Sequence, residues 1–371
     1  MKVLMVAPSV RVPDTLGQTL HQLALANGLA ERGIDITLLC RYDLETPNSV
    51  FLHPNLRLLP IIDPKIPFER PIFTYDSYYT VINELKIGNY DLVHDRGYIF
   101  AGSGVKAASE IGVNSILQID DNWIRSELSA TKIARLWPYN QGAEYSCRYQ
   151  IERATGGFTV STVLREQIST WSPEAKNFSV IQNGYEEDLF RPDVKSFRIR
   201  EKLNIQGKIA VFVGALGPWH GLDEIVEIAI RNPELSVIVA GGGYGSILPK
   251  IGNLYHIGRL ERKDVPRLLV DADIGLAPYP NIDYGFSPLK IYEYMGCKLP
   301  VIATRLPSVE EATQGCALLV RPGQMPDAIS KILERDELLS KMAKSGYEFA
   351  IKKRTWKKTI DKTIELYEEF V

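Results

Sequence analysis

The chain has 371 residues, of which 45% are hydrophobic and 24% charged, and its formal net charge is −2. This length is enough for two domains with full cores, and the near-neutral charge gives no support for binding nucleic acid. The four cysteines lie far apart without a CxxC pair, which indicates neither a disulfide framework nor a zinc site. The apolar run at the N-terminus is too short for a signal peptide and no stretch could span a membrane, so we expect a cytoplasmic protein.

Short apolar runs alternate with amphipathic segments through the first half of the chain. The expected strands are residues 3–7, 34–39, 92–93, 115–119 and 157–160. Between the first two runs, Leu16, Leu20 and Leu23 share one face of a helix that ends at Gly33, a residue suited to a helix C-cap. Continuous apolar strands that alternate with helices are typical of parallel sheets covered on both faces.

The same alternation starts again in the second half. The expected strands are residues 209–213, 235–240, 255–258, 274–277, 300–303 and 317–320. Residues 182–188, in which Asn-Gly is followed by acidic residues, form the best candidate linker. We therefore expect two doubly wound α/β domains, residues 1–180 and 181–355, followed by an amphipathic helix at 356–371.

The most informative segment is 283–296, where a loop rich in turn residues leads into a helix. Pro288 suits the first position of a helix, where a missing N–H costs nothing. Four N–H groups are expected to point out of the helix start, those of Phe286, Ser287, Leu289 and Lys290. Together with the helix dipole and the Lys290 charge they would bind an anion, while Glu293 could accept hydrogen bonds from hydroxyls. A phosphate attached to a sugar would fit such a site.

Residues 283–296, followed by Leu-Pro-Val-Ile-Ala at 299–303, resemble the nucleotide-sugar signature of retaining GT-B glycosyltransferases of family 4. The resemblance covers nearly the whole chain and is strongest from residue 209 to 303. It implies two Rossmann-like domains facing across a cleft, an acceptor-side domain at 1–180 and a donor-binding domain at 181–355. It also implies that helix 356–371 crosses back to the first domain.

The resemblance assigns donor contacts to several positions of the second domain. Glu293 matches the family's second signature glutamate and is expected to accept the ribose hydroxyls. Gly285 stands where the first glutamate would be, so the backbone of Gly285 and Phe286, or Asp283 after a loop rearrangement, would hold the transferred sugar. The other donor-binding residues expected from the resemblance are Gly214, Gly242, Arg259, Ser287, Pro288 and Leu289.

The turn at 214–221 departs from the family pattern. The family usually has an arginine and a lysine here, both on the donor diphosphate, whereas this chain has Ala215 and His220. A phosphate neighbour would favour the charged form of His220; the alternative is that His220 caps a helix. In the first domain, Gly17 matches a turn near the donor phosphates, or serves only as a loop glycine.

On the acceptor side, His94 follows a short strand and Asp120 and Asp121 follow another. Many family members have a histidine that reaches the transferred sugar where this chain has Asp120. We expect Asp120 to hydrogen-bond sugar hydroxyls, and His94 and Asp121 to face the acceptor. One of the two aspartates is also expected to cap the following helix.

The resemblance implies a retaining glycosyltransferase that moves a sugar from a nucleotide diphosphate to an acceptor hydroxyl, with Asp120, His220 and Lys290 as catalytic residues. No metal or other cofactor is expected. The acceptor could be a sugar, a lipid-linked molecule or a small molecule, and the base, the sugar and the oligomeric state stay open. The basic run at 352–358 fits either a solvated helix face or peripheral contact with acidic lipids. A non-catalytic partner subunit and a sugar-nucleotide epimerase of the same fold are the alternatives.

Overall fold

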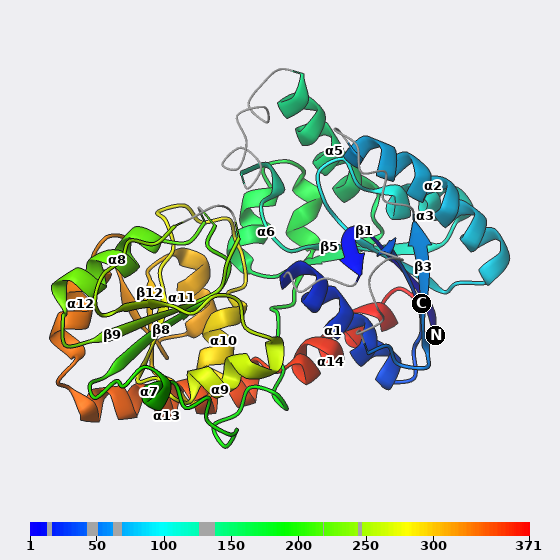
Figure 1. Ribbon diagram of the computed structural model, residues 1–371. Coiled ribbons are helices and arrows are strands. Elements are labelled where there is room, and N and C mark those ends of the chain that lie inside the picture. Colours follow the sequence, from blue (N-terminus) through cyan, green and yellow to red (C-terminus); the bar gives the residue numbers. More distant parts are fainter. Residues whose placement is uncertain (13–16, 43–50, 62–68, 126–137, 218, 244–246) are drawn as a thin grey trace. The chain divides into compact units, whose positions relative to one another are not determined.

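The computed structural model describes residues 1–12, 17–42, 51–61, 69–125, 138–217, 219–243 and 247–371. The chain divides into two compact units. The first unit comprises Met1–Gln182, Tyr284–Phe286 and Trp356–Val371, and the second comprises Asn183–Asp283 and Ser287–Thr355. Each unit is built around its own parallel sheet, with helices on both faces (Figure 1).

The sheet of the first unit has seven strands over the described residues, in the order β3-β2-β1-β4-β5-β6-β7. The strands are β1 (Lys2–Val12), β2 (Asp35–Tyr42), β3 (Leu56–Ile61), β4 (Leu92–Arg96), β5 (Asn114–Ile119), β6 (Gly156–Thr159) and β7 (Ser179–Val180). The helices are α1 (Gly17–Glu31), α2 (Glu69–Gly88), α3 (Ser103–Ile111), α5 (Tyr139–Arg153), α6 (Thr162–Ile168) and α14 (Trp356–Glu368).

Alternate residues of β1 enter different cores because successive side chains of a strand point to opposite faces. Val3 and Met5 pack into a core with residues of α1 and α14, whereas Leu4 and Val6 pack into one with residues of α2 and α3. Both faces of this strand are therefore buried, which explains its continuous apolar sequence.

The C-terminal helix α14 packs against α1 in the first unit (Figure 1, red and blue). Gly28 of α1 makes this approach close, since a Cβ at this position would lie 2.0 Å from Cδ1 of Ile360. Trp356, Ile360 and Tyr367 are buried in the shared core. The expected return of the final helix to the first domain is confirmed.

The sheet of the second unit has six strands over the described residues, in the order β10-β9-β8-β11-β12-β13. The strands are β8 (Ile209–Val213), β9 (Ser236–Ala240), β10 (Leu254–His256), β11 (Ile274–Ala277), β12 (Val301–Thr304) and β13 (Leu318–Val320). The helices are α7 (Ile199–Lys202), α8 (Leu222–Arg231), α9 (Val265–Leu269), α10 (Leu289–Gly296), α11 (Pro307–Thr313), α12 (Met325–Ile332) and α13 (Asp336–Lys353).

The expected fold class, two doubly wound parallel α/β units, is confirmed. Two strands were not predicted: β3, which carries Arg57 and Pro60 at the edge of its sheet, and the two-residue β7. Proline and exposed polar residues are tolerated at an edge because one side of the strand needs no hydrogen-bond partner. Every helix in the described part of the chain is too short or too polar to cross a lipid bilayer.

Candidate functional site

Three turns interlock at the carboxyl ends of the strands in the second unit. The Gly214 N–H donates to Ala240 O at 3.0 Å, and the Gly241 N–H donates to Gly258 O at 2.8 Å. A Cβ at Gly241 would lie only 1.8 Å from Gly214 O, so glycine is required for this approach. The turn after β8 is thereby fixed against the turn after β9, at the edge of the sheet where ligands of such folds bind.

Lys290, the second residue of α10, reaches this edge. Its Nζ lies 4.0 Å from the centre of the Phe212 ring and 3.4 Å from each ring nitrogen of His220. Gly214 leaves the necessary room, because a Cβ there would lie 2.9 Å from Nζ. Lys290 is half-buried, and no carboxylate of the described residues forms an ion pair with it.

Burial shapes the charge of this pair. Desolvation lowers the pKa of Lys290 to about 7, with Glu293 acting in the opposite direction. Desolvation and the nearby Lys290 charge lower the pKa of His220 to about 2, so its imidazole is neutral at physiological pH. An anion between the two side chains would favour their charged forms.

Glu293 is also near this site but already has a partner. It is 7% exposed, and its Oε1 accepts a hydrogen bond from Arg262 Nη2 at 2.7 Å. The same guanidinium donates from Nε to Glu186 at 2.8 Å and lies 4.4 Å from the centre of the Phe190 ring. Sequence reasoning missed Arg262, which lies in the polar run Glu-Arg-Lys-Asp at 261–264, where nothing distinguishes it from a surface residue.

The start of α10 differs from the prediction in two ways. The helix begins at Leu289 with Pro288 as its N-cap residue, one position later than predicted. The Leu289 N–H donates to Ser287 O at 3.0 Å, so the expectation that this group is unpaired is wrong. The Ser287 hydroxyl lies 3.2 Å from the Tyr292 hydroxyl.

Asp283 has a structural role that the sequence did not reveal. Its carboxylate accepts hydrogen bonds from the Ser308 N–H at 2.7 Å and from the Ser308 hydroxyl at 2.6 Å. These contacts satisfy the first turn of α11. With these contacts in place Asp283 does not stand in for the missing signature glutamate, and the loop rearrangement that this role requires remains a prediction.

Gly285 and Phe286 belong to the first unit. Gly285 has φ +72°, its carbonyl accepts from the Ser161 hydroxyl at 2.6 Å, and a Cβ on it would lie 2.6 Å from Cβ of Leu164. Positive φ and close packing both favour glycine here. The residue that departs from the family signature is thus required by local packing.

The remaining predicted donor residues lie at element ends. Gly17 is the first residue of α1, and the carbonyl of Gly242 accepts from the Leu216 N–H at 3.3 Å. Arg259 is exposed in the loop after β10. Their contacts with a donor remain predictions.

A buried polar cluster occupies the strand ends of the first unit. Arg96 donates from Nε to Asp120 Oδ2 at 2.9 Å and from Nη1 to the Ser9 hydroxyl at 3.0 Å. Gln118 donates to Asp120 Oδ1 at 2.7 Å. Burial alone would raise the pKa of Asp120, but Arg96, His21 and Gln118 outweigh it and hold that pKa below its ordinary value. Asp120 is thus an ionised carboxylate with protein donors on both oxygens.

His94 is fully buried in this cluster. Its Nε2 bonds to Gln118 Oε1 at 2.8 Å, and its Nδ1 bonds to the Tyr367 hydroxyl of α14. Burial lowers the pKa of His94 to about 4, so the ring is neutral. The expectation that His94 faces the acceptor is wrong, since neither ring nitrogen is left for a ligand.

Two further carboxylates differ in role. Asp95 is buried and accepts from the Val105 N–H at the start of α3, and burial raises its pKa to about 7. Asp121 is half-buried, and its acceptor contact remains a prediction. The prediction that an aspartate caps the helix after β5 is wrong, because Asn122 accepts the Arg125 N–H at 3.1 Å.

No cluster of three or more His, Cys, Asp or Glu in the described ranges could hold a metal ion.

Comparison with known proteins matches both halves of the chain. The family described as "Glycosyl transferases group 1" matches residues 207–335, and the family described as "Glycosyltransferase Family 4" matches residues 16–189. The chain belongs to the group 1/family 4 glycosyltransferases. It is therefore a glycosyltransferase that uses a nucleotide-sugar donor.

Individual relatives of this glycosyltransferase are distant. A D-inositol 3-phosphate glycosyltransferase of Mycobacterium leprae (strain Br4923) is 24% identical over 343 residues, 84% of this chain and 76% of the relative. The match to the Bacillus subtilis (strain 168) protein TuaH, 28% identical over 144 residues, spans 35% of each chain.

Many solved structures share the fold of this glycosyltransferase, and two of them illustrate the similarity. Sucrose-phosphate synthase from Thermosynechococcus elongatus has a TM-score of 0.81 at 17% identity, covering 99% of this chain and 98% of the other. Anabaena HepE, in complex with UDP-glucose, has a TM-score of 0.72 at 14% identity over the full length of both chains.

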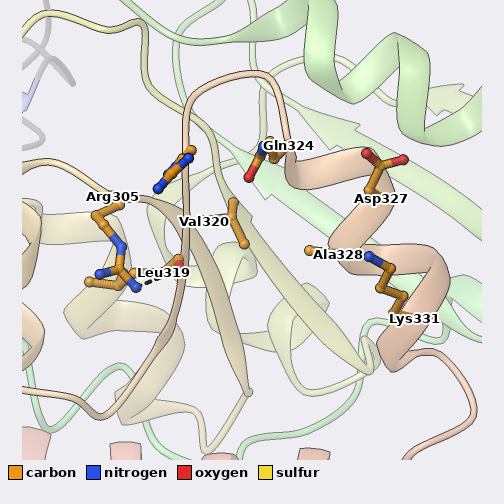
Figure 2. Close-up of a pocket in the computed structure, with 8 residues that line it drawn as sticks. Arg305, Leu319, Val320, Gln324, Asp327, Ala328 and Lys331 are labelled. Atoms are coloured by element: carbon orange, nitrogen blue, oxygen red, sulfur yellow. Dashed lines mark hydrogen bonds between the residues drawn. The ribbon is translucent and has the colours of Figure 1, made fainter.

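The second unit also has a hollow of about 550 Å³ beside β12, β13 and α12, away from the residues predicted to bind the donor (Figure 2). Its lining residues are Arg305, Leu319, Val320, Arg321, Gln324, Asp327, Ala328 and Lys331. Asp327 is paired with Arg231 at 2.6 Å, and Lys331 forms no ion pair with a described residue. No predicted site residue lines this hollow, so Lys331 offers a comparison for Lys290.

Proposed function

We propose that Lys290, His220 and the start of α10 bind the diphosphate of the donor. The observation that carries this proposal is the state of Lys290. Its ammonium group is half-buried beside Gly214 and lacks a carboxylate partner among the described residues. An ammonium group that is partly desolvated and not paired with a carboxylate is destabilised. A bound diphosphate would supply the negative charge that pairs with it.

The chain lacks two cations that the family usually directs at the diphosphate. Lys290, His220 and the start of α10 must therefore neutralise a larger share of the diphosphate charge. The neutral His220 can share a proton with Lys290 across 3.4 Å, and both can become cationic when an anion binds. We place the growing charge of the leaving diphosphate here, where preorganised donors stabilise it in the transition state.

We further propose transfer with retention at the anomeric carbon. The leaving phosphate would take the proton of the acceptor hydroxyl on the same face, so that the protein acts mainly by positioning the two substrates. Analysis of the product anomer by NMR tests this step, and an inverted product would refute it.

UDP-sugars are the first donors to test, because the HepE structures that share this fold contain UDP and UDP-glucose. Glu293 would accept the ribose hydroxyls. On the acceptor side, a hollow of about 470 Å³ in the first unit is lined by Asn122, Glu166, Gln167 and Trp171, among others. Amide, carboxylate and indole groups suit a sugar, so we propose a sugar-containing acceptor there.

The test is a Lys290→Met variant, which keeps the volume and removes the charge. We expect the Kd for UDP, measured by calorimetry, to rise roughly 10-fold or more, the worth of a hydrogen bond to a charged group. Lys331→Met removes a lysine that forms no ion pair with a described residue, from the hollow beside β12, β13 and α12, and should leave the Kd unchanged. Equal effects of the two variants would refute the assignment, as would unchanged binding in Lys290→Met.

A further inference from the structure

Arg262 connects the proposed ribose carboxylate to a second acid. Its Nη2 donates to Glu293 Oε1 at 2.7 Å, while its Nε donates to Glu186 Oε2 at 2.8 Å. The Phe190 ring lies beneath the guanidinium, 4.4 Å from ring centre to Cζ. One planar cation thus holds two carboxylates in a fixed arrangement, which arginine does better than lysine.

The local chain fixes the second acid. Glu186 lies close after the Asn-Gly pair at 183–184, and its carbonyl accepts the Phe190 N–H at 2.8 Å. This turn brings the Glu186 carboxylate and the Phe190 ring to the same guanidinium. Arg262 is therefore anchored on one side by a rigid turn, and its other side faces Glu293.

Arg262 donates to only one of the two carboxylate oxygens of Glu293. Oε1 is bound by Arg262, whereas Oε2 has no hydrogen-bond donor among the residues that the structure describes. Glu293 is only 7% exposed, so without Arg262 its carboxylate would be both poorly solvated and unpaired. With Arg262 in place, the side chain is oriented and one oxygen remains for a neutral donor such as a hydroxyl.

We infer that Arg262 is a positioning residue for donor recognition: it orients Glu293 so that Oε2 accepts hydrogen bonds from the ribose hydroxyls. The inference rests on the proposed function, since it requires a nucleotide at this site. It separates two tasks within the second unit. Lys290 and His220 serve the diphosphate, whereas Arg262 acts only on the sugar ring of the nucleoside, through Glu293.

This division predicts which ligands respond to a change at Arg262. The probes are UDP and 2′,3′-dideoxy-UDP, which lacks both ribose hydroxyls and keeps the base and the diphosphate. Wild-type protein should bind UDP roughly 10-fold or more tightly than the dideoxy compound, because a hydrogen bond to a charged group is lost. Arg262→Gln should weaken UDP and leave the dideoxy compound nearly unchanged, so that the ratio falls to about 1–3.

Arg267→Gln is the matched control. Arg267 also pairs with an acid, Asp264, at 2.6 Å, and is 35% exposed against 30% for Arg262. It forms no hydrogen bond or ion pair with Glu293. The control variant should keep the wild-type preference for UDP. Arg262→Lys, which keeps the charge, should restore part of that preference.

The outcomes separate the two proposals. If Arg262→Gln keeps the preference for UDP, or weakens both ligands equally, Arg262 has only a structural role and the inference fails. If wild-type protein binds neither ligand, or binds both equally, the proposed ribose contact of Glu293 fails first. Should Arg262→Gln be too unstable to assay, Arg262→Lys and Glu186→Gln replace it, and both should show a reduced preference for UDP.

Discussion

The close approach of Gly241 to Gly214 allows one perturbation to be worked out in detail. In Gly241→Ala, the new methyl group would lie 1.8 Å from Gly214 O, against a lower limit of 3.0 Å for real contacts. The obstacle is a backbone carbonyl, which cannot rotate away as the end of a side chain can. One of the two turns must therefore move by more than about 1 Å, a backbone shift of the kind that overpacking forces.

The expected loss of stability has two parts. Overpacking typically costs about 1–3 kcal/mol, and alanine at φ +151° adds about 1–3 kcal/mol of backbone strain. The total, about 2–6 kcal/mol, is a large part of the free energy of unfolding of a typical domain. Displacement of Gly214 also moves the turn beside Lys290, and a 1 Å misplacement lowers turnover by about 100-fold.

The assay is urea unfolding followed by circular dichroism, together with turnover of a UDP-sugar. Gly243→Ala shares a positive φ of +95°, but no atom of the described residues lies within 4 Å of its Cβ position, so it should lose only the strain part. Gly252 has no positive φ and no atom of the described residues within 4 Å of its Cβ position. Gly252→Ala should therefore leave the free energy of unfolding nearly unchanged. If Gly241→Ala is no less stable than Gly243→Ala and keeps wild-type turnover, the packing argument is refuted.

Two further predictions follow from buried groups. Between about pH 7 and pH 9, UDP affinity should fall by up to tenfold per pH unit, because Lys290 has a pKa of about 7 and must take up a proton to bind the diphosphate. Over the same range the stability of the unliganded protein should rise with pH, because Lys290 is already largely neutral in the folded protein whereas the unfolded chain still holds its proton. Lys290→Met should remove both slopes, the first in calorimetry and the second in urea unfolding. Tyr367→Phe should lower the free energy of unfolding by about 1–3 kcal/mol, because it leaves a buried nitrogen of His94 unpaired; an unchanged urea midpoint would contradict this.

The sequence predicted the fold well because parallel sheets covered on both faces require continuous apolar strands. All six strands of the second unit were expected, within one or two residues at their ends. The edge strands of the first unit escaped detection since they carry polar residues, proline or too few residues for a pattern. A strand buried on both faces has a continuous apolar sequence that can be recognised, whereas an edge strand does not need one.

The candidate site was predicted only in part. Lys290, His220 and Gly214 do lie together, because motifs at the carboxyl ends of parallel strands converge on one edge of the sheet. The partners of Glu293 and Asp283 could not be found, because Arg262 and Ser308 are polar residues whose sequence context shows no pattern. Hydrogen bonds between residues far apart in the sequence leave no periodic trace.

Helix α14 also has a consequence for the synthesis of the chain. During translation, the strands of the first unit and helix α1 leave the ribosome exit tunnel long before α14. Helix α14 is synthesised only after the whole second unit. Until then, the core that Trp356, Ile360 and Tyr367 complete lacks its last helix. A nascent chain of this kind exposes apolar surface for many seconds at ordinary rates of translation. Chaperone binding to the partly made first unit would protect that surface, and a stop codon before residue 356 would leave it uncovered permanently.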